Sequence, residues 1–167
     1  NRTAILEQIQ KNVEAVAPDL PEYKYIPLHQ KPSPSVLSLR EVMLLLRKVI
    51  FPGFFGSEQE AQVDSINIIQ GNLEQIYDLL HEQIYNGLCF EVDRCCDSKD
   101  RASRIAMDFI NKIPYIKYLF QQMQAILDGD PAAKSLSEII FCYPAVHAIL
   151  HQRVAHELLK LGVPVLP

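Results

Sequence analysis

The sequence is poor in glycine, with 6 in 167 residues, and it has no excess of charged residues, which make up 22% of the chain. Apolar residues make up 49%. This composition excludes a collagen-like rod and a disordered tail, and it is typical of a globular domain. A chain of this length is one domain's worth and buries roughly two-thirds of its unfolded surface around a single core, so we expect one compact body.

Long apolar stretches are also missing. No segment approaches the roughly 18–20 apolar residues that a membrane-spanning helix needs. The first residues, NRTAILEQIQKNVEAV, are amphipathic, whereas a signal peptide has a charged segment followed by an apolar one. We therefore expect no membrane partner and a cytoplasmic location.

Clusters of basic residues, which bind phosphate backbones, are absent as well. The net charge is −4, and residues 57–100 carry two basic residues, Arg94 and Lys99, against ten acidic ones. We therefore expect no nucleic-acid binding. The acidic side chains Glu74, Asp78 and Glu82 are interpreted as a solvent-exposed helix face, with a protein-binding surface as the alternative.

The four cysteines show no C-x2-C spacing; they are Cys89, Cys95, Cys96 and Cys142. The adjacent pair is a poor basis for a disulfide framework or a zinc knuckle. We expect reduced, partly buried thiols and no metal site.

Apolar residues recur at helical spacings along most of the chain, and almost none alternate. This pattern predicts an all-α fold, a bundle of five or six helices without a substantial sheet. A first helix is expected over residues 3–16. The segment 18–35 holds five prolines, which remove backbone donors, so it is expected to be a linker or a wrapping arm.

Two capping signals mark further helix starts. Ser38 with Glu41, and Ser57 with Glu60, have the spacing of a capping box, so helices are expected to begin at both serines. The second helix should extend to about Asn86. It carries an apolar seam suited to helix packing: Ile66, Ile69, Leu73, Ile76, Leu80 and Ile84.

The second half of the chain predicts two more helical regions. Residues 99–127 form one pattern, which Pro114 should split or kink. Residues 144–162 form another, because Pro144 suits a first helical position and Gly162 suits the position after a helix end.

The last predicted helix contains several polar residues. His147 and His151 lie one turn apart, a spacing that can hold a metal, but no third ligand is evident nearby. We interpret His147, Arg153 and His156 as residues that hydrogen-bond other helices. A Gly-rich phosphate loop, a Gly-x-Ser-x-Gly elbow and a His-Glu-x-x-His pair are all missing.

Residues 124–162 carry a dense pattern that packing alone does not dictate. It comprises Asp130-Pro131-Ala132, Tyr143-Pro144, His147-Ala148, Arg153 and Ala155-His156. This pattern resembles the end of the amino-terminal helical domain of the serine O-acetyltransferases. Ala145 and Glu157 depart from it, since a glycine and an aromatic residue are common at those positions in the family.

The resemblance implies a longer enzyme, in which a left-handed β-helix of hexapeptide repeats follows the helical domain. We expect this chain to be its amino-terminal fragment, with a first helix and arm (1–37), the helical domain (38–162) and the start of a linker (163–167). The enzyme would transfer acetyl from acetyl-CoA to the hydroxyl of L-serine, giving O-acetylserine for cysteine biosynthesis.

The resemblance also implies the partners of that enzyme. L-cysteine would be a feedback inhibitor, and the helical domains would join trimers into a hexamer. O-acetylserine sulfhydrylase would bind a carboxy-terminal tail that this chain lacks. The family's catalytic histidines lie on the β-helix, so we assign no catalytic residue and no bound cofactor to this chain, and acetyl-CoA is a cosubstrate of the whole enzyme.

The pair Asp130-Pro131 has two possible roles. An aspartate before a proline is a good cap for a short turn, because its carboxylate accepts backbone N–H bonds. The family pattern implies a substrate-binding role for Asp130 and Pro131, in which the carboxylate accepts the α-ammonium of serine or cysteine.

Two other functions remain open from the sequence. A non-enzymatic helical adaptor could use the seam and the acidic face to bind another protein. A related hexapeptide-repeat acyltransferase could use a different acceptor.

Overall fold

The computed structural model describes residues 2–16, 33–57, 64–91, 98–120 and 123–167. These residues form eight helices and no strand, which confirms the all-α prediction. The chain divides into two compact units, Asn1–Gln30 and Lys31–Pro167. Most of the proline-rich segment 18–35 lies outside the described residues.

The first unit contains helix α1 (Arg2–Val16), close to the helix predicted over 3–16. Its side chains Ile5, Leu6 and Ile9 are exposed. No described helix of the chain is long and apolar enough to cross a membrane.

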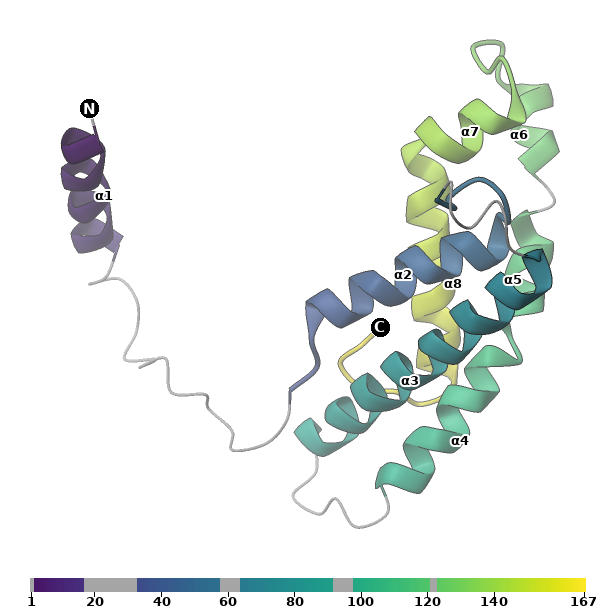
Figure 1. The fold of residues 1–167 in the computed structure, drawn as a ribbon, viewed down its shortest axis with the longest axis horizontal. Helices are drawn as coiled ribbons and strands as arrows, with labels where there is room; N and C mark the ends of the chain where they lie inside the picture. Colours follow the sequence, from purple (N-terminus) through teal and green to yellow (C-terminus); the bar gives the residue numbers. More distant parts are fainter. Residues whose placement is uncertain (1, 17–32, 58–63, 92–97, 121–122) are drawn as a thin grey trace. The chain divides into compact units, whose positions relative to one another are not determined.

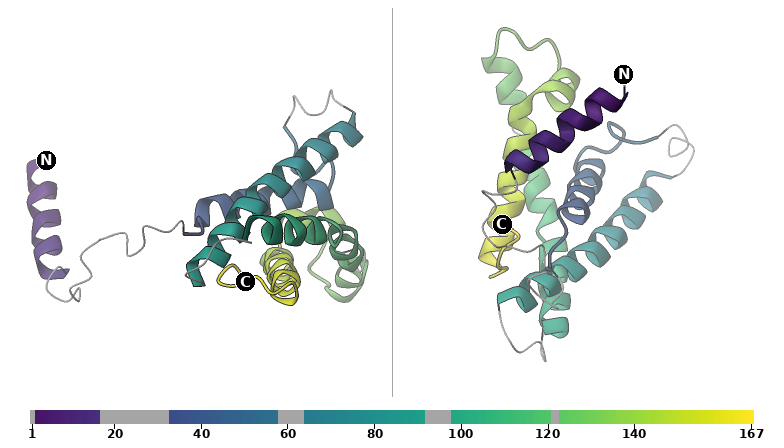
Figure 2. Two further views of the ribbon diagram at one scale, coloured as in Figure 1. Left: turned by 90° about the horizontal axis from the view of Figure 1, so that it is seen from below. Right: turned by 90° about the vertical axis from the view of Figure 1, so that its left-hand side faces the viewer.

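The second unit is built around three helices packed side by side: α2 (Val36–Ile50), α3 (Ser65–Glu91) and α4 (Ser98–Ile110). Figure 1 shows that α3 runs antiparallel to both of its neighbours, and Figure 2 shows the same arrangement from two other sides. Apolar side chains from these helices and from those that follow form one core.

Two predicted helix starts were wrong. Helix α2 is capped by Ser35, whose Oγ accepts a hydrogen bond from the backbone N–H of Ser38 at 3.2 Å. Helix α3 begins at Ser65, where Asp64 Oδ1 accepts from the N–H of Ile66 at 3.1 Å. At α2, the side-chain oxygen of the nearby Ser35 competes successfully with the predicted cap at Ser38. Residues 58–63, which follow the predicted start at Ser57, lie outside the described residues.

The pattern predicted over 99–127 is divided into three helices. After α4 come α5 (Ile113–Phe120) and α6 (Met123–Gly129), and Pro114 is the second residue of α5. Proline fits the first turn of a helix because the N–H that it lacks has no partner there, so the break comes just before it, as predicted.

A short helix, α7 (Leu136–Cys142), was not predicted; it is followed by α8 (Pro144–Lys160). Helix α8 starts at Pro144 as expected. It ends where Gly162 has φ +71° and the N–H of Val163 donates to the carbonyl of Leu158 at 3.1 Å. This is the Schellman arrangement that a glycine after a helix end favours.

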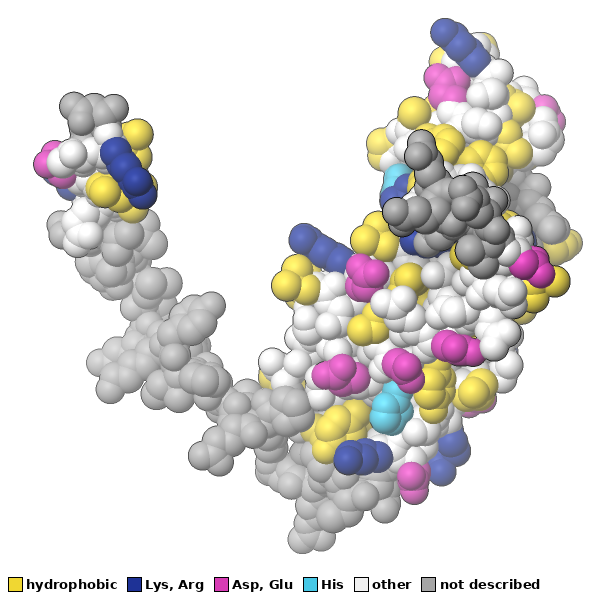
Figure 3. Space-filling model, in the orientation of Figure 1, with side chains coloured by type: hydrophobic (Ala, Val, Ile, Leu, Met, Phe, Trp, Pro, Cys, Tyr) yellow, Lys and Arg dark blue, Asp and Glu magenta, His cyan; other side chains and the backbone are white. Residues whose placement is uncertain are grey.

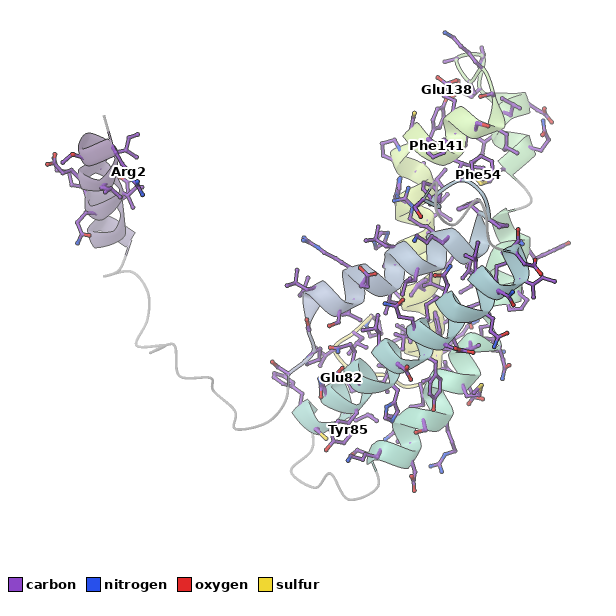
Figure 4. All side chains as sticks on the ribbon, in the orientation of Figure 1. Arg2, Phe54, Glu82, Tyr85, Glu138 and Phe141 are labelled. Atoms are coloured by element: carbon purple, nitrogen blue, oxygen red, sulfur yellow. The ribbon has the colours of Figure 1, made fainter. Side chains whose placement is uncertain are left out.

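The apolar seam of α3 is used inside the second unit. Ile76, Leu80 and Ile84 are fully buried, whereas Ile66 at the start of the helix is 71% exposed. Glu74, Asp78 and Glu82 are exposed, as predicted. Figure 3 shows acidic side chains distributed along α3 on the face in view, and Figure 4 labels Glu82 among them.

The prediction of reduced cysteines was wrong for Cys89, which is disulfide-bonded. Cys142 is a free and exposed thiol. Cys95 and Cys96 lie outside the described residues.

Candidate functional site

Asp130 lies directly after α6, at the start of the segment that joins α6 to α7 (Figure 1). Its Oδ1 accepts a hydrogen bond from the N–H of Ala132 at 2.9 Å, and its carbonyl oxygen accepts from the N–H of Ala133 at 3.1 Å. Pro131 occupies the second position of this turn, which its fixed φ suits. The carboxylate therefore caps a turn, not the start of α7, which Ser135 caps.

The second carboxylate oxygen of Asp130 also has a partner within the chain. The phenol of Tyr143 donates a hydrogen bond to Asp130 Oδ2 at 2.9 Å. This hydrogen bond, with some burial and the negative charges of Asp130 and Glu138, raises the pKa of the Tyr143 phenol above its ordinary value. Two contacts from different parts of the chain thus hold the carboxylate plane.

Tyr143 lies at the junction of two helices. It follows the last residue of α7 and precedes Pro144, the first residue of α8, with φ −79° and ψ 115°. Its N–H donates to the carbonyl of Ile139 at 3.2 Å, and its carbonyl accepts from the N–H of Val146 at 3.1 Å. The backbone of Tyr143 is therefore fixed on both sides.

A reciprocal capping arrangement places the neighbouring acidic residue Glu138. Its N–H donates to Ser135 Oγ at 3.1 Å, and its Oε2 accepts from the N–H of Lys134 at 2.9 Å. The spacing Ser135-x-x-Glu138 is a capping-box signal in the sequence that could have predicted α7. Glu138 is labelled in Figure 4, on α7.

The carboxylate of Asp130 keeps the capacity to bind a ligand. Asp130 is half-buried, and the adjacent Pro131 and Ala132 are exposed. A carboxylate offers about four lone-pair sites, and two are used within the chain. A cation that donates hydrogen bonds, such as an ammonium group, suits the remaining ones.

Two cavities lie elsewhere on the second unit. One, of about 350 Å³, has Ile50, Phe54 and Lys117 in its lining; the other, of about 360 Å³, includes Leu44 and Arg47. Neither is lined by Asp130 or Pro131. Asp130 thus lies outside these two cavities, in a turn whose next residues, Pro131 and Ala132, are exposed.

Aromatic side chains of the segment that follows α2 pack against an aromatic side chain of α7. The ring of Phe141 lies 5.6 Å from the ring of Phe54 and 5.2 Å from that of Phe55, measured between centroids. Figure 4 shows Phe54 and Phe141 beside each other. The guanidinium carbon of Arg47 lies 4.0 Å from the centroid of Phe55, a cation–π distance. These contacts fix one side of α7.

The histidines of α8 are not gathered with other potential metal ligands among the described residues. Burial, the charge of Arg47 and the neighbouring His151 lower the pKa of His147. His151 Nδ1 donates to the carbonyl of His147 at 2.7 Å, and His156 is exposed. No group of three or more potential metal ligands occurs among the described residues.

The expected hydrogen bonding of Arg153 is not found at its Nε atom. That atom is buried and has no hydrogen-bond partner among the described residues. The charge of Arg47 on α2 acts on His147 on α8, a residue distant in the sequence, so no local signal could have predicted this interaction.

Comparisons with curated proteins identify relatives of this chain. It is 38% identical over 144 residues to a serine acetyltransferase of Synechococcus elongatus described as a plasmid protein; the match covers 81% of this chain and 45% of the relative. A serine acetyltransferase of Synechocystis is 41% identical over 49 residues, covering 29% of this chain and 20% of the relative. One from Mycobacterium tuberculosis is 46% identical over 44 residues, covering 26% and 19%.

The similarity extends well beyond a short motif. No protein-family model matches the chain. The chain spans about half the length of the Synechococcus relative, to which most of its own length is similar. The chain is therefore homologous, over 81% of its length, to a curated protein named serine acetyltransferase.

Proposed function

We propose that this chain is the substrate-proximal helical domain of a serine O-acetyltransferase, and that Asp130 and Pro131 form part of its amino-acid site. The observation that carries the proposal is the turn at Asp130, whose carboxylate is held at both oxygens and is still open to a ligand. The similarity to serine acetyltransferases supports the choice of substrate.

The proposed reaction transfers an acetyl group from acetyl-CoA to L-serine. The serine hydroxyl oxygen attacks the thioester carbonyl carbon, a C–O bond forms and the C–S bond breaks. The hydroxyl proton passes through a general base to the departing thiolate of CoA. The products are O-acetylserine and CoA, and the net change requires no oxidant or reductant.

Asp130 would contribute binding and orientation to this reaction. Its carboxylate would accept a charge-assisted hydrogen bond from the α-ammonium of serine, which fixes one end of the substrate while the hydroxyl reacts at the other. The same contact would serve L-cysteine as feedback inhibitor, because cysteine carries the same ammonium group. Pro131 would hold the turn in shape.

The general base and the acetyl-CoA site would come from outside these residues. By family resemblance they belong to the hexapeptide-repeat domain, so we assign no catalytic residue and no cofactor to this chain. The isolated chain is expected to be inactive. The half-buried His147 has the residue type of a general base, but residue type alone does not give it that role.

The whole protein would act as a cytoplasmic homo-oligomer, a hexamer formed from two trimers, and would bind O-acetylserine sulfhydrylase. Three residues of the α3 seam, Ile76, Leu80 and Ile84, are buried within the unit and are not available for self-association. Exposed apolar side chains such as Ile66, Met107 and Leu159 remain as candidate contacts. Light scattering on the isolated chain tests this, and a monomer at all concentrations would assign assembly to other parts of the protein.

The activity is tested by measuring CoA thiol release from acetyl-CoA with L-serine. The full-length protein should release thiol in proportion to serine, and residues 1–167 alone should not exceed a buffer blank. A full-length protein that leaves serine unchanged would overturn the proposed function. Activity of the isolated chain would overturn our placement of the catalytic residues.

A further inference from the structure

We propose that Tyr143 is a positioning residue for the amino-acid site, which orients the Asp130 carboxylate toward the substrate ammonium. This inference rests on the proposed function, because it requires Asp130 to bind the amino acid. Tyr143 itself would not contact the reacting atoms. Its role follows from the hydrogen bond that its phenol donates to Asp130 Oδ2 at 2.9 Å.

The orientation of a carboxylate is weakly determined by its own torsion. The last torsion of aspartate is broad, so a single contact at one oxygen leaves the carboxylate plane poorly defined. The N–H of Ala132 holds Oδ1, and the phenol of Tyr143 holds Oδ2. The second contact fixes the plane, and with it the directions of the lone pairs that are left for a ligand.

The fold holds Tyr143 in place before any ligand arrives. The residue joins α7 to α8, and both its N–H and its carbonyl are hydrogen-bonded within these helices. The following Pro144 restricts the backbone further. A donor on such a rigid support loses little freedom when the ligand binds, which is the condition for a preorganised site.

The protonation state of Tyr143 suits this role. The hydrogen bond to Asp130 and the nearby charge of Glu138 raise the pKa of the phenol, so it remains a neutral donor at physiological pH. Because the phenol adds no charge, the negative charge of Asp130 stays available for an ammonium. A lysine or arginine at this place would instead neutralise the carboxylate.

The contact itself is tested on residues 1–167. In an alkaline titration followed by phenolate absorbance, the difference between the wild-type chain and Tyr143→Phe reports the Tyr143 phenol. The transition should lie above that of an exposed tyrosine and should move to lower pH in Asp130→Asn, which has lost the negative charge. An ordinary titration of Tyr143, unaffected by Asp130→Asn, would overturn the contact and the inference with it.

The role in binding is tested by steady-state kinetics of the full-length protein. Tyr143→Phe should raise the KM for serine about 3- to 10-fold, the effect of losing one hydrogen bond, and leave the KM for acetyl-CoA unchanged. Tyr118→Phe, in which the same hydroxyl is removed from a side chain 59% exposed on α5, is the matched control and should behave as wild type. A merely structural defect would affect both substrates alike.

The combination with Asp130→Asn separates this inference from the proposed function. If Tyr143 acts through Asp130, Tyr143→Phe should add little to the serine defect of Asp130→Asn. If Asp130→Asn weakens serine binding and Tyr143→Phe matches Tyr118→Phe, the positioning role falls and the proposed site stands. If Asp130→Asn leaves serine kinetics unchanged, the proposed site and this inference both fall.

Discussion

The carbonyl oxygen of Pro164 lies 3.0 Å from the position that a Cβ atom would occupy on Gly87. The Cδ1 atom of Leu166 lies 2.9 Å from the same position. The segment after α8 thus crosses α3 so closely that a Cβ atom at Gly87 would require neighbouring atoms to shift. Nearby, Val163 is buried, so the crossing segment is anchored in the core.

Alanine at Gly87 should destabilise the chain for this reason. Alanine favours a helix over glycine by about 0.5–1 kcal/mol, but here its methyl group would displace backbone, and overpacking costs about 1–3 kcal/mol. Gly71→Ala is the matched control on the same helix, since nothing lies within 4 Å of its Cβ position. Urea unfolding should give the highest free energy of unfolding for Gly71→Ala, an intermediate value for wild type and the lowest value for Gly87→Ala. Equal gains from both substitutions would contradict the close crossing.

A buried amide on α3 should stabilise the start of α2. The side chain of Gln83 is 1% exposed, and its Oε1 accepts a hydrogen bond from the N–H of Ser35 at 2.6 Å. Gln83→Ala should lower the free energy of unfolding by about 1–3 kcal/mol, because the N–H loses its partner. Gln70→Ala removes an exposed hydrogen bond to Glu74 and should change it by less than about 0.5 kcal/mol. Equal losses of unfolding free energy in the two variants would show that the buried hydrogen bond stabilises the chain no more than the exposed one.

The lowered pKa of His147 predicts a loss of stability in mild acid. Above the ordinary histidine pKa of about 6.5, the imidazole is neutral in both the folded and the unfolded chain, so its titration contributes nothing. As the pH falls below that value, the unfolded chain binds the proton first, and folding becomes less favourable until the folded pKa is passed. Burial and the charge of Arg47 cause this difference.

His147→Gln should therefore lose less stability than wild type between pH 7 and pH 5, measured by urea unfolding at about half-unit intervals. His156→Gln, at an exposed position of the same helix, is the control and should keep the wild-type dependence. If the unfolding free energy of His147→Gln falls with pH as steeply as that of wild type, other groups cause the acid sensitivity.

The spacing of apolar residues was sufficient to predict that the chain is helical. Pro144 and Gly162 were sufficient to predict the two ends of α8. These features are local, since proline and glycine restrict the backbone wherever they stand. The start of α2 was misplaced because several serines near it could serve as caps, and tertiary contacts select among them. The bond from Ser35 to Gln83 joins residues 48 apart and illustrates such a selection.

The candidate site was predictable in part. The aspartate–proline pair indicates a turn, and the family pattern indicates Asp130 as the substrate-binding residue. The partnership of Asp130 with Tyr143 depends on α7, a helix of seven residues too short for apolar periodicity to reveal. Its capping box at Ser135 and Glu138 was the available signal, and Glu138 is one of the two acidic residues that raise the pKa of Tyr143.

The binding role of Asp130 is tested most directly by the kinetics of Asp130→Asn in the full-length protein. Asparagine keeps the size of the side chain but removes the charge that would meet the substrate ammonium. Loss of a charge-assisted hydrogen bond should lower kcat/KM for serine by about tenfold or more, leave the KM for acetyl-CoA near its wild-type value, and weaken inhibition by cysteine in parallel. Wild-type serine kinetics and cysteine sensitivity in this variant would contradict the account and leave Asp130 with a purely structural role in its turn.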